Sequence, residues 1–334
     1  MSHRQNMTAA SSKPWPCGLL RLFILGGLVS LAACATAPNE TIPPPPPAAL
    51  RAPDAEQRVF ATPEQAVDAL VAAARDNRGD ELEEILGHNS GQLIHSGDKV
   101  ADKQGREKFL SAYDKAHEIE CKGDNQDVLV VGEEKWPMPI PLARAKDGWW
   151  FDTTAGAQEI LDRRVGRNEL DVIEVCRAYV EAQQDFAARH PLNGVYAYAQ
   201  RFRSAKGQHN GIYWPAANGQ PESPLGPMMA NATAEGYSGK VLSKHAPYHG
   251  YFYKILKRQG SHAPGGEKDY IVDGHMTGGF ALIAFPARYG DSGVMTFIVS
   301  RNGIVYEKNL GPDTTEAARN ITQFDPDDSW NIVE

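Results

Sequence analysis

A run of apolar and small residues over 22–33 most constrains where this chain can fold. It ends in Leu31-Ala32-Ala33-Cys34. Its 12 residues fall short of the roughly 20 that a membrane-spanning helix needs. Three basic residues precede it: Arg4, Lys13 and Arg21. A basic start, an apolar middle and a small-residue exit are typical of a secretory signal. We therefore predict that residues 1–33 are a signal peptide and that the rest folds outside the cytoplasm.

The end of this run resembles the lipobox of bacterial lipoproteins. The resemblance implies that Cys34 is acylated, with palmitate as an acyl chain, and becomes the first residue after cleavage. Acyl chains contribute about 0.8 kcal/mol per buried methylene, so several chains give a stable attachment. Ala35 replaces the Asp that would favour the inner membrane, which implies the outer membrane, facing the periplasm. The alternative is a plain secretory signal in which Cys34 follows Ala33 by coincidence.

Residues 34–58 are predicted to be the lipidated cysteine and a proline-rich tether. The run Pro43–Pro47 favours polyproline II, which extends by about 3.1 Å per residue and builds no core. A proline-rich ligand for a recognition module is the alternative.

The chain is acidic, with 34 basic and 42 acidic residues. Removing residues 1–33 takes away three basic residues and no acidic one, so the net charge changes from −8 to −11. Such a body has no basic surface for a nucleic-acid backbone, and we expect no nucleic-acid partner.

Residues 59–155 are predicted to form an N-terminal α+β domain. Thr62-Pro63-Glu64 supplies the N-cap, first-turn proline and first-turn acid of a helix. Further helices are expected up to residue 117. Three short β-prone segments follow, over 128–131, 140–145 and 149–152. This order resembles the cystatin and nuclear-transport-factor-like (NTF2-like) folds, in which helices cover a small curved antiparallel sheet and can enclose a pocket.

Residues 156–334 are predicted to form a second α+β domain, a long helix packed on an antiparallel meander. The chain is expected to be helical again from Ala155, with the long amphipathic helix over 168–190, and residues 191–247 are expected to be mostly loop. Four strands should follow, over 250–256, 280–285, 294–300 and 304–308. Asn302-Gly303 predicts a tight turn between the last two strands, because both residues tolerate positive φ.

Six short blocks of the sequence resemble a known family. They are Trp136–Pro141, Phe151–Thr153, Ile160–Arg164, Gly166–Leu170, Tyr248–Tyr251 and Phe285–Gly290. In this order they resemble the bacterial domain of unknown function 2950 family, over about residues 58 to 334. The resemblance implies an exported lipoprotein and carries over no activity.

The C-terminal half also resembles the globular heads of pseudopilins and pilin-like proteins. Asn168-Glu169 and Ala182-Gln183 in the expected helix, Asn193–Ala197 after it and Gly303–Tyr306 in the hairpin carry this resemblance. Pilins polymerise through an apolar N-terminal helix, whereas this helix carries charges on its exposed face. The resemblance therefore implies a head-type surface that docks onto another envelope protein, not a filament core.

The sequence contains no recognisable catalytic set, and we expect neither a cofactor nor a metal. Gly290-Asp291-Ser292-Gly293 matches the nucleophile segment of chymotrypsin-like proteases, but such a serine needs a histidine base and a buried carboxylate. We interpret the segment as a turn. Four histidines lie in the second half: His245, His249, His262 and His275. The i, i+4 pair His245 and His249 has Pro247 between its members, which argues against a helix that presents both rings to zinc.

Four aromatic residues are candidates for contact with a glycan or a partner protein: Tyr213, Trp214, Tyr248 and Tyr251. Their side chains combine a flat apolar face with a polar edge, which suits stacking on a sugar. Strands also need such residues for their core, and we favour core packing.

Cys121 and Cys176 are the cysteines that remain beside the signal peptide and the lipid site. In an oxidising compartment they could form a disulfide, worth roughly 4 kcal/mol by loop entropy. Alternatively Cys176, which falls on an apolar helix face, is a buried free thiol. The sequence leaves both alternatives open.

These features predict a non-enzymatic bacterial envelope lipoprotein that acts as a periplasm-facing interaction or assembly module with an envelope protein as partner. The first alternative is an envelope enzyme or small-ligand binder that uses a pocket in the N-terminal domain. The second is binding of cell-wall glycan through the loops between Gly207 and Gly250.

Overall fold

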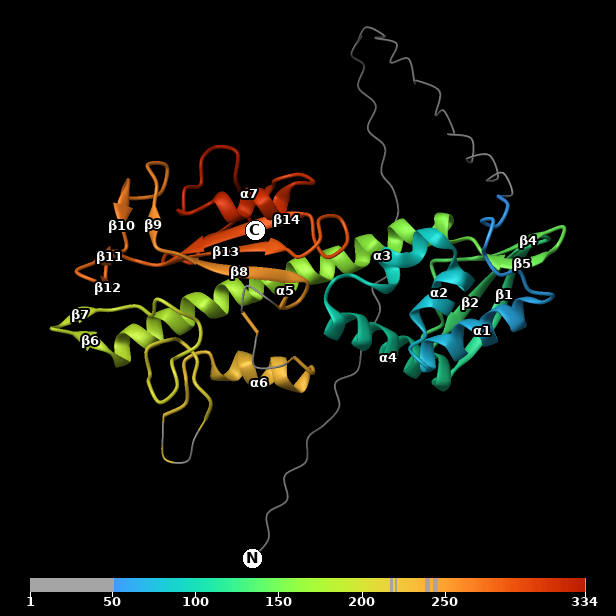
Figure 1. The fold of residues 1–334 in the computed structure, drawn as a ribbon, viewed down its shortest axis with the longest axis horizontal. Helices are drawn as coiled ribbons and strands as arrows, with labels where there is room; N and C mark the ends of the chain where they lie inside the picture. The colour runs from blue at the N-terminus through green and yellow to red at the C-terminus, as the bar shows by residue number, and fades with distance from the viewer. Residues whose placement is uncertain (1–50, 217–218, 220, 238–240, 243–245, 334) are drawn as a thin grey trace, which may run out of the picture. The chain divides into compact units, whose positions relative to one another are not determined.

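The structure is a computed structural model. It describes residues 51–216, 219, 221–237, 241–242 and 246–333. Residues 1–50, with the predicted signal peptide, Cys34 and most of the tether, lie outside the described residues. Residues 49–334 form one compact unit. Its described part is a mixed α+β fold with seven α-helices and several open antiparallel sheets, so the predicted fold class is confirmed (Figure 1).

Helices come first along the chain. They are α1 (Pro63–Arg75), α2 (Gly79–Leu86), the 3-10 turn η1 (His88–Ser90), α3 (Gly91–Ile94) and α4 (Lys99–Lys115). The predicted start of the first helix is confirmed: Thr62 is the N-cap and its hydroxyl accepts a hydrogen bond from the amide of Gln65. The apolar stripe of α1, which includes Val67 and Leu70, is buried against the sheet that follows.

That sheet has five antiparallel strands in the order β1-β2-β4-β5, with β3 also paired to β2. The strands are β1 (His117–Gly123), β2 (Gln126–Val131), β3 (Trp136–Pro137), β4 (Leu142–Ala145) and β5 (Gly148–Phe151). The three predicted strands correspond to β2, β4 and β5. The sequence did not predict β1, because its residues are mostly polar and it lies exposed at the sheet edge.

One helix, α5 (Thr153–Arg189), connects the two hydrophobic clusters of the fold. The helical segment predicted from Ala155 and the long helix predicted over 168–190 are one continuous helix in the structure. Asp152 is the N-cap and accepts a hydrogen bond from the amide of Ala155 (3.2 Å). The helix has 37 residues and therefore spans about 55 Å.

The C-terminal sheet has the antiparallel order β16-β15-β14-β13-β8. Its strands are β8 (Tyr251–Leu256), β13 (Ala281–Pro286), β14 (Met295–Ser300), β15 (Val305–Asn309) and β16 (Asn331–Ile332). The first four match the predicted strands. Every residue of β13, which lies between β14 and β8, is buried, and α5 packs against β13, β14 and β15. In the turn between β14 and β15 only Gly303 of the predicted pair adopts positive φ (77°).

Short elements complete the C-terminal half. They are β6 (Pro191–Leu192), β7 (Val195–Tyr196), α6 (Gly226–Ala234), β9 (Arg258–Gln259), β10 (Lys268–Asp269), β11 (Ile271–Val272), β12 (His275–Met276) and α7 (Thr314–Asn320). Pairing joins β6 to β7, β9 to β10 and β11 to β12.

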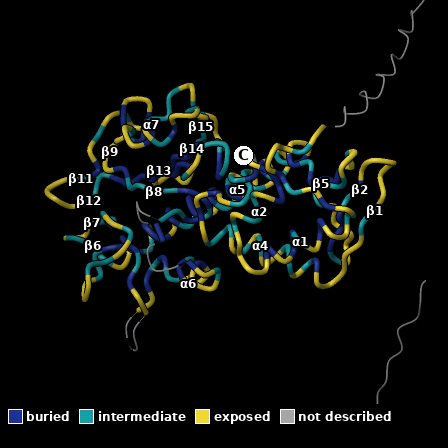
Figure 2. Tube along the Cα trace, turned by 45° about the vertical axis from the view of Figure 1, so that its right-hand side comes forward, coloured by how far each residue is buried: buried dark blue, intermediate teal, exposed yellow. Residues whose placement is uncertain are grey.

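Burial is concentrated in two clusters (Figure 2). The first lies between the N-terminal helices and the N-terminal sheet, and its fully buried members end at Phe151. The second begins at Val172 and lies between the C-terminal half of α5, α6 and the C-terminal sheet. The domain boundary between residues 155 and 156 stays a prediction. No helix in the described part of the chain is both long and apolar enough for a bilayer crossing.

Candidate functional site

Polar side chains in the middle of α5 fix this helix to the loop that leads into β14. The Nδ2 of the buried Asn168 donates a hydrogen bond to the carbonyl oxygen of Ser292 (2.8 Å). One carboxylate oxygen of Glu169 accepts hydrogen bonds from the amides of Val294 and Met295, both at 2.9 Å. Two adjacent helix residues thus satisfy backbone groups more than 120 positions away.

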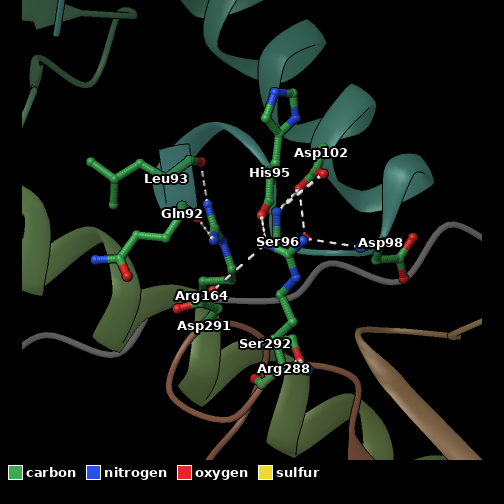
Figure 3. A network of polar contacts seen from close by, with 10 residues as sticks. All are labelled: Gln92, Leu93, His95, Ser96, Asp98, Asp102, Arg164, Arg288, Asp291 and Ser292. Atoms are coloured by element: carbon green, nitrogen blue, oxygen red, sulfur yellow. Dashed lines mark hydrogen bonds and ion pairs between the residues drawn. The ribbon is translucent and has the colours of Figure 1, made fainter. Parts of the chain in front are cut away.

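Two arginines connect the same region to α3 and to the residue that follows this helix (Figure 3). The guanidinium of Arg164, on α5, donates to the carbonyl oxygens of Gln92 and Leu93. That of Arg288, in the loop after β13, donates to the carbonyl oxygen of His95 (2.9 Å). Both cations therefore hold the N-terminal half of the fold to the C-terminal half.

Partial burial shifts the pKa values of the basic and acidic groups of this region in opposite directions. Desolvation lowers the pKa of Arg164, and the charges of Asp102 and Asp291 oppose that shift. Desolvation raises the pKa of Asp291, and Arg288 and Arg164 oppose it. The arginines and aspartates therefore stabilise one another's charged forms in a region that is only partly hydrated.

Asp98 is the most buried carboxylate of the region, with 2% of its surface exposed. Its Oδ1 caps α4 by accepting hydrogen bonds from the amides of Val100 (3.1 Å) and Ala101 (3.2 Å). Its Oδ2 accepts from the hydroxyl of Tyr237 (2.9 Å) and from the amide of Gly250 (3.0 Å). All four donors are satisfied by one side chain, and burial raises the pKa of Tyr237 well above its usual value.

We refer to these residues together as the central polar network: Asp98, Arg164, Asn168, Glu169, Tyr237, Gly250, Arg288, Asp291 and Ser292. Four of the blocks that resemble the known family contribute to it. Ile160–Arg164 supplies Arg164, Gly166–Leu170 supplies Asn168 and Glu169, Tyr248–Tyr251 supplies Gly250, and Phe285–Gly290 supplies Arg288. A Cβ at position 250 would lie 2.7 Å from Nδ2 of Asn168, so glycine is required for this approach.

The segment Gly290–Gly293 is a turn, as predicted. The amide of Gly290 donates to the carbonyl oxygen of Gly293 (2.9 Å). The hydroxyl of the fully buried Ser292 donates to the carbonyl oxygen of Arg288 and accepts from its amide, both at 3.0 Å. A Cβ at position 293 would fall 2.0 Å from the hydroxyl oxygen of Tyr251. Ser292 therefore shapes a turn and does not present a nucleophile.

The histidines do not converge in the described part of the chain, and His245 lies outside it. His249 adopts positive φ (49°), and its ring lies between the carboxylates of Asp171 (3.3 Å) and Glu235 (3.6 Å). His262 pairs with Asp325 on another loop. Within the described residues, no group of three or more His, Cys, Asp or Glu side chains has an arrangement that could hold a metal ion.

Three of the four candidate contact aromatics are core residues. Trp214, Tyr248 and Tyr251 are at most 4% exposed and belong to the C-terminal cluster. Tyr213 is half-buried, and the guanidinium of Arg203 lies over its ring at 5.0 Å from the centroid. A glycan-stacking platform built from all four rings does not fit this burial, because the faces of three of them already contact protein atoms.

The two cysteines are free thiols in the structure. Cys121 is exposed on β1, and Cys176 is fully buried on α5. Burial raises the pKa of the Cys176 thiol to about 12. Of the two alternatives that the sequence left open, a disulfide or free thiols, the structure has free thiols.

Two neighbouring hairpins expose large apolar side chains. Val195 and Tyr196 of β7 are 53% and 62% exposed, and Val272 of β11 is 49% exposed. The amide of Tyr198 donates to the carbonyl oxygen of Met276 (2.8 Å), which places the two hairpins side by side. We call Val195, Tyr196 and Val272 the apolar tip.

The sequence placed Val195 and Tyr196 in the block that resembles pilin-type heads, but it did not predict that they form an exposed apolar surface with Val272. The signal for this surface was the pair of dipeptides Asn193-Gly194 and Asp273-Gly274, each a typical two-residue hairpin turn. All four of these residues have positive φ, between 48° and 81°. The first dipeptide lies in a region interpreted as mostly loop, and the turn at the second was not predicted.

One comparison with known proteins gives a match. The family model described as "Protein of unknown function (DUF2950)" matches residues 57–333. No curated protein and no solved structure matches the chain.

Proposed function

This chain belongs to the DUF2950 family, and we propose that it is a lipid-anchored bacterial envelope protein that acts as a periplasm-facing interaction or assembly module. The signal run and Cys34 in the sequence support export and anchoring, with the outer membrane as the site. The proline-rich segment before residue 51 supports a spacer between lipid and folded body. An envelope protein is the proposed partner, and we propose no catalytic activity.

The observation that carries this proposal is the apolar tip. Isolated exposed apolar residues are common on soluble proteins, but several of them on two hairpins that lie side by side favour a binding surface. Tyr196 suits the centre of such a surface, because tyrosine is enriched among the residues that dominate binding energy. Positive-φ turns hold both hairpins, so the surface is formed before a partner arrives.

The finer fold resemblances are consistent with this role. A long helix packed on an antiparallel sheet supports the likeness of the C-terminal half to a pilin-type head. Helices α1, α2 and α4 over an open antiparallel sheet support the likeness of the N-terminal half to cystatin and NTF2-like folds. The first half of α5 contacts α3 and η1, so this helix does not have the free apolar stem of a pilin.

Site-specific photocrosslinking in intact cells tests the role of the tip. A photoreactive amino acid at Tyr196 should yield a defined adduct with an envelope protein. The control is the same amino acid at Ile332, which is 59% exposed on β16 and does not belong to the tip. The change Val272→Ser should weaken the adduct at position 196 without lowering the amount of protein. Equal adducts from both positions, or none from position 196, would contradict the proposal.

The anchor is tested separately. Cells that express the full chain should incorporate labelled palmitate into it, and Cys34→Ala should abolish incorporation while Cys17→Ala should not. Membrane fractionation should recover the acylated chain with the outer membrane. Palmitate labelling that persists in the Cys34→Ala variant would refute the assignment.

A further inference from the structure

A second surface feature lies at the turn between β4 and β5, in the N-terminal half. The backbone of Phe60 pairs with that of Trp149, with hydrogen bonds of 2.8 and 2.7 Å. Gly148 permits this approach, because a Cβ there would lie 2.3 Å from the carbonyl oxygen of Phe60. The amide of Arg144 donates to the carbonyl oxygen of Asn125, which brings the turn between β1 and β2 alongside (2.9 Å). These contacts bring three separate segments together around one depression.

The depression has a volume of about 720 Å³, which is within the range of small-molecule sites. Most of the polar side chains that line it are hydrogen-bond donors: Arg51, Asn125, Arg144 and Lys146. Asp147 is the single carboxylate of the lining. The depression is open to solvent and lies at the end of the hairpin, not in an interior cavity of the sheet.

The cations of this depression have few acidic partners. Within the described residues, neither Arg144 nor Lys146 forms an ion pair, and the guanidinium of Arg51 reaches Asp152 only at 4.0 Å. Arg144 lies over the ring of Trp149, its cross-strand neighbour, at 5.8 Å from the centroid. The ring limits the freedom of the guanidinium, so less entropy is lost when an anion binds to it.

We propose that this depression is a binding site for an anionic group, a phosphate or a carboxylate. Arg144 lies on β4 and Lys146 in the turn that follows this strand, and both residues line the depression. A guanidinium forms paired hydrogen bonds with either anion, and the ammonium adds a charge beside it. The chain as a whole carries a net negative charge, which repels anions from the rest of its surface.

Two sources could supply the anionic group. One is a small soluble anion, and the other is the headgroup of an anionic lipid. Arg51 lies within the segment 34–58 predicted to be the tether, so a lipid headgroup is within reach of an anchored chain. The site itself depends only on described residues and does not rest on the proposed anchor.

Titration calorimetry on the purified full chain in a non-ionic detergent tests the site. The probes are inorganic phosphate, citrate and dioctanoyl phosphatidylglycerol, with dioctanoyl phosphatidylcholine as the zwitterionic control. The test variant is Arg144→Gln with Lys146→Gln. The matched control is Lys257→Gln with Arg301→Gln, which removes two exposed cations of the C-terminal half that also lack ion pairs in the described structure.

At least one anionic probe should bind the unmodified chain, and the test variant should bind it at least about tenfold more weakly. The control variant should bind it within about twofold of the unmodified chain. Binding of phosphate or citrate would indicate a soluble anion, and binding of phosphatidylglycerol alone would indicate a headgroup. Lack of binding by every anionic probe, an equal loss in both variants, or equal binding of phosphatidylcholine would overturn the proposal.

A second variant distinguishes weaker binding from a folding defect. If the double change lowers the thermal unfolding temperature, Lys146→Gln alone replaces it, because the side chain of Lys146 has no hydrogen bond or ion pair in the described structure. It should weaken binding about threefold without a change in unfolding temperature. Unchanged affinity in that variant would also overturn the proposal.

Discussion

Removing the carboxylate of Asp98 should destabilise the fold more than an ordinary helix cap would. Asp98→Ala deletes the cap of α4, which costs about 1 kcal/mol. It also leaves the buried amide of Gly250 without its hydrogen-bond acceptor, which costs about 1–3 kcal/mol. The hydroxyl of Tyr237 loses its acceptor as well. The free energy of unfolding should therefore fall by about 2–4 kcal/mol.

The matched control is Asp152→Ala, because Asp152 is also an N-cap aspartate but has no hydrogen bond to the C-terminal half. It should cost only about 1 kcal/mol. Urea unfolding followed by tryptophan fluorescence gives both values, and a double-mutant cycle of Asp98→Ala with Tyr237→Phe should show coupling of at least about 0.5 kcal/mol. If Asp98→Ala and Asp152→Ala lower the free energy of unfolding equally, and the double-mutant cycle shows no coupling, Asp98 does not hold the two halves together.

Two further predictions concern a histidine and the cysteines. The hydrogen bond that the His262 ring donates to the carboxylate of Asp325, and the charge of that carboxylate, raise the pKa of His262, so this pair adds stability below about pH 6.5, and the contribution is lost as the pH rises through the raised value. Proton NMR should find the His262 pKa lowered towards about 6.5 by Asp325→Asn, and an unchanged pKa would contradict the pairing. A thiol reagent at pH 8 should label Cys121 in the native chain but Cys176 only after denaturation, because burial raises the Cys176 pKa to about 12. Mass spectrometry identifies the labelled residue, and a disulfide-linked peptide pair would show the opposite arrangement.

Local sequence patterns predicted the regular elements well where one face of the element is buried. The apolar stripe of α1 and the β-prone run of β14 carry their own periodicity, so both were found. Strand β1 was missed because only Ile119 of its seven residues is a large aliphatic side chain, and it pairs as an exposed edge. The helical segments expected from Ala155 and over 168–190 were not joined into one helix, because the first turns of α5 carry few apolar residues.

Local sequence patterns could not predict the central polar network, for a different reason. Asp98 and Gly250 lie 152 positions apart, and Arg288 and His95 lie 193 positions apart. Nothing in either neighbourhood indicates that a carboxylate and a distant amide meet, since that contact depends on the packing of α5 against both clusters. By contrast, Gly290–Gly293 was correctly interpreted as a turn, because the residues that shape it are consecutive.

The continuity of α5 makes the spacing of its residues matter more than their chemical identity. A single inserted residue near its midpoint would rotate everything beyond it by about 100° and shift it by about 1.5 Å. Asn168 and Glu169 would then miss the loop before β14 even though every contact upstream stayed intact. Natural variants of this chain should accordingly accept many substitutions along the helix while gaining or losing residues only in the loops outside it.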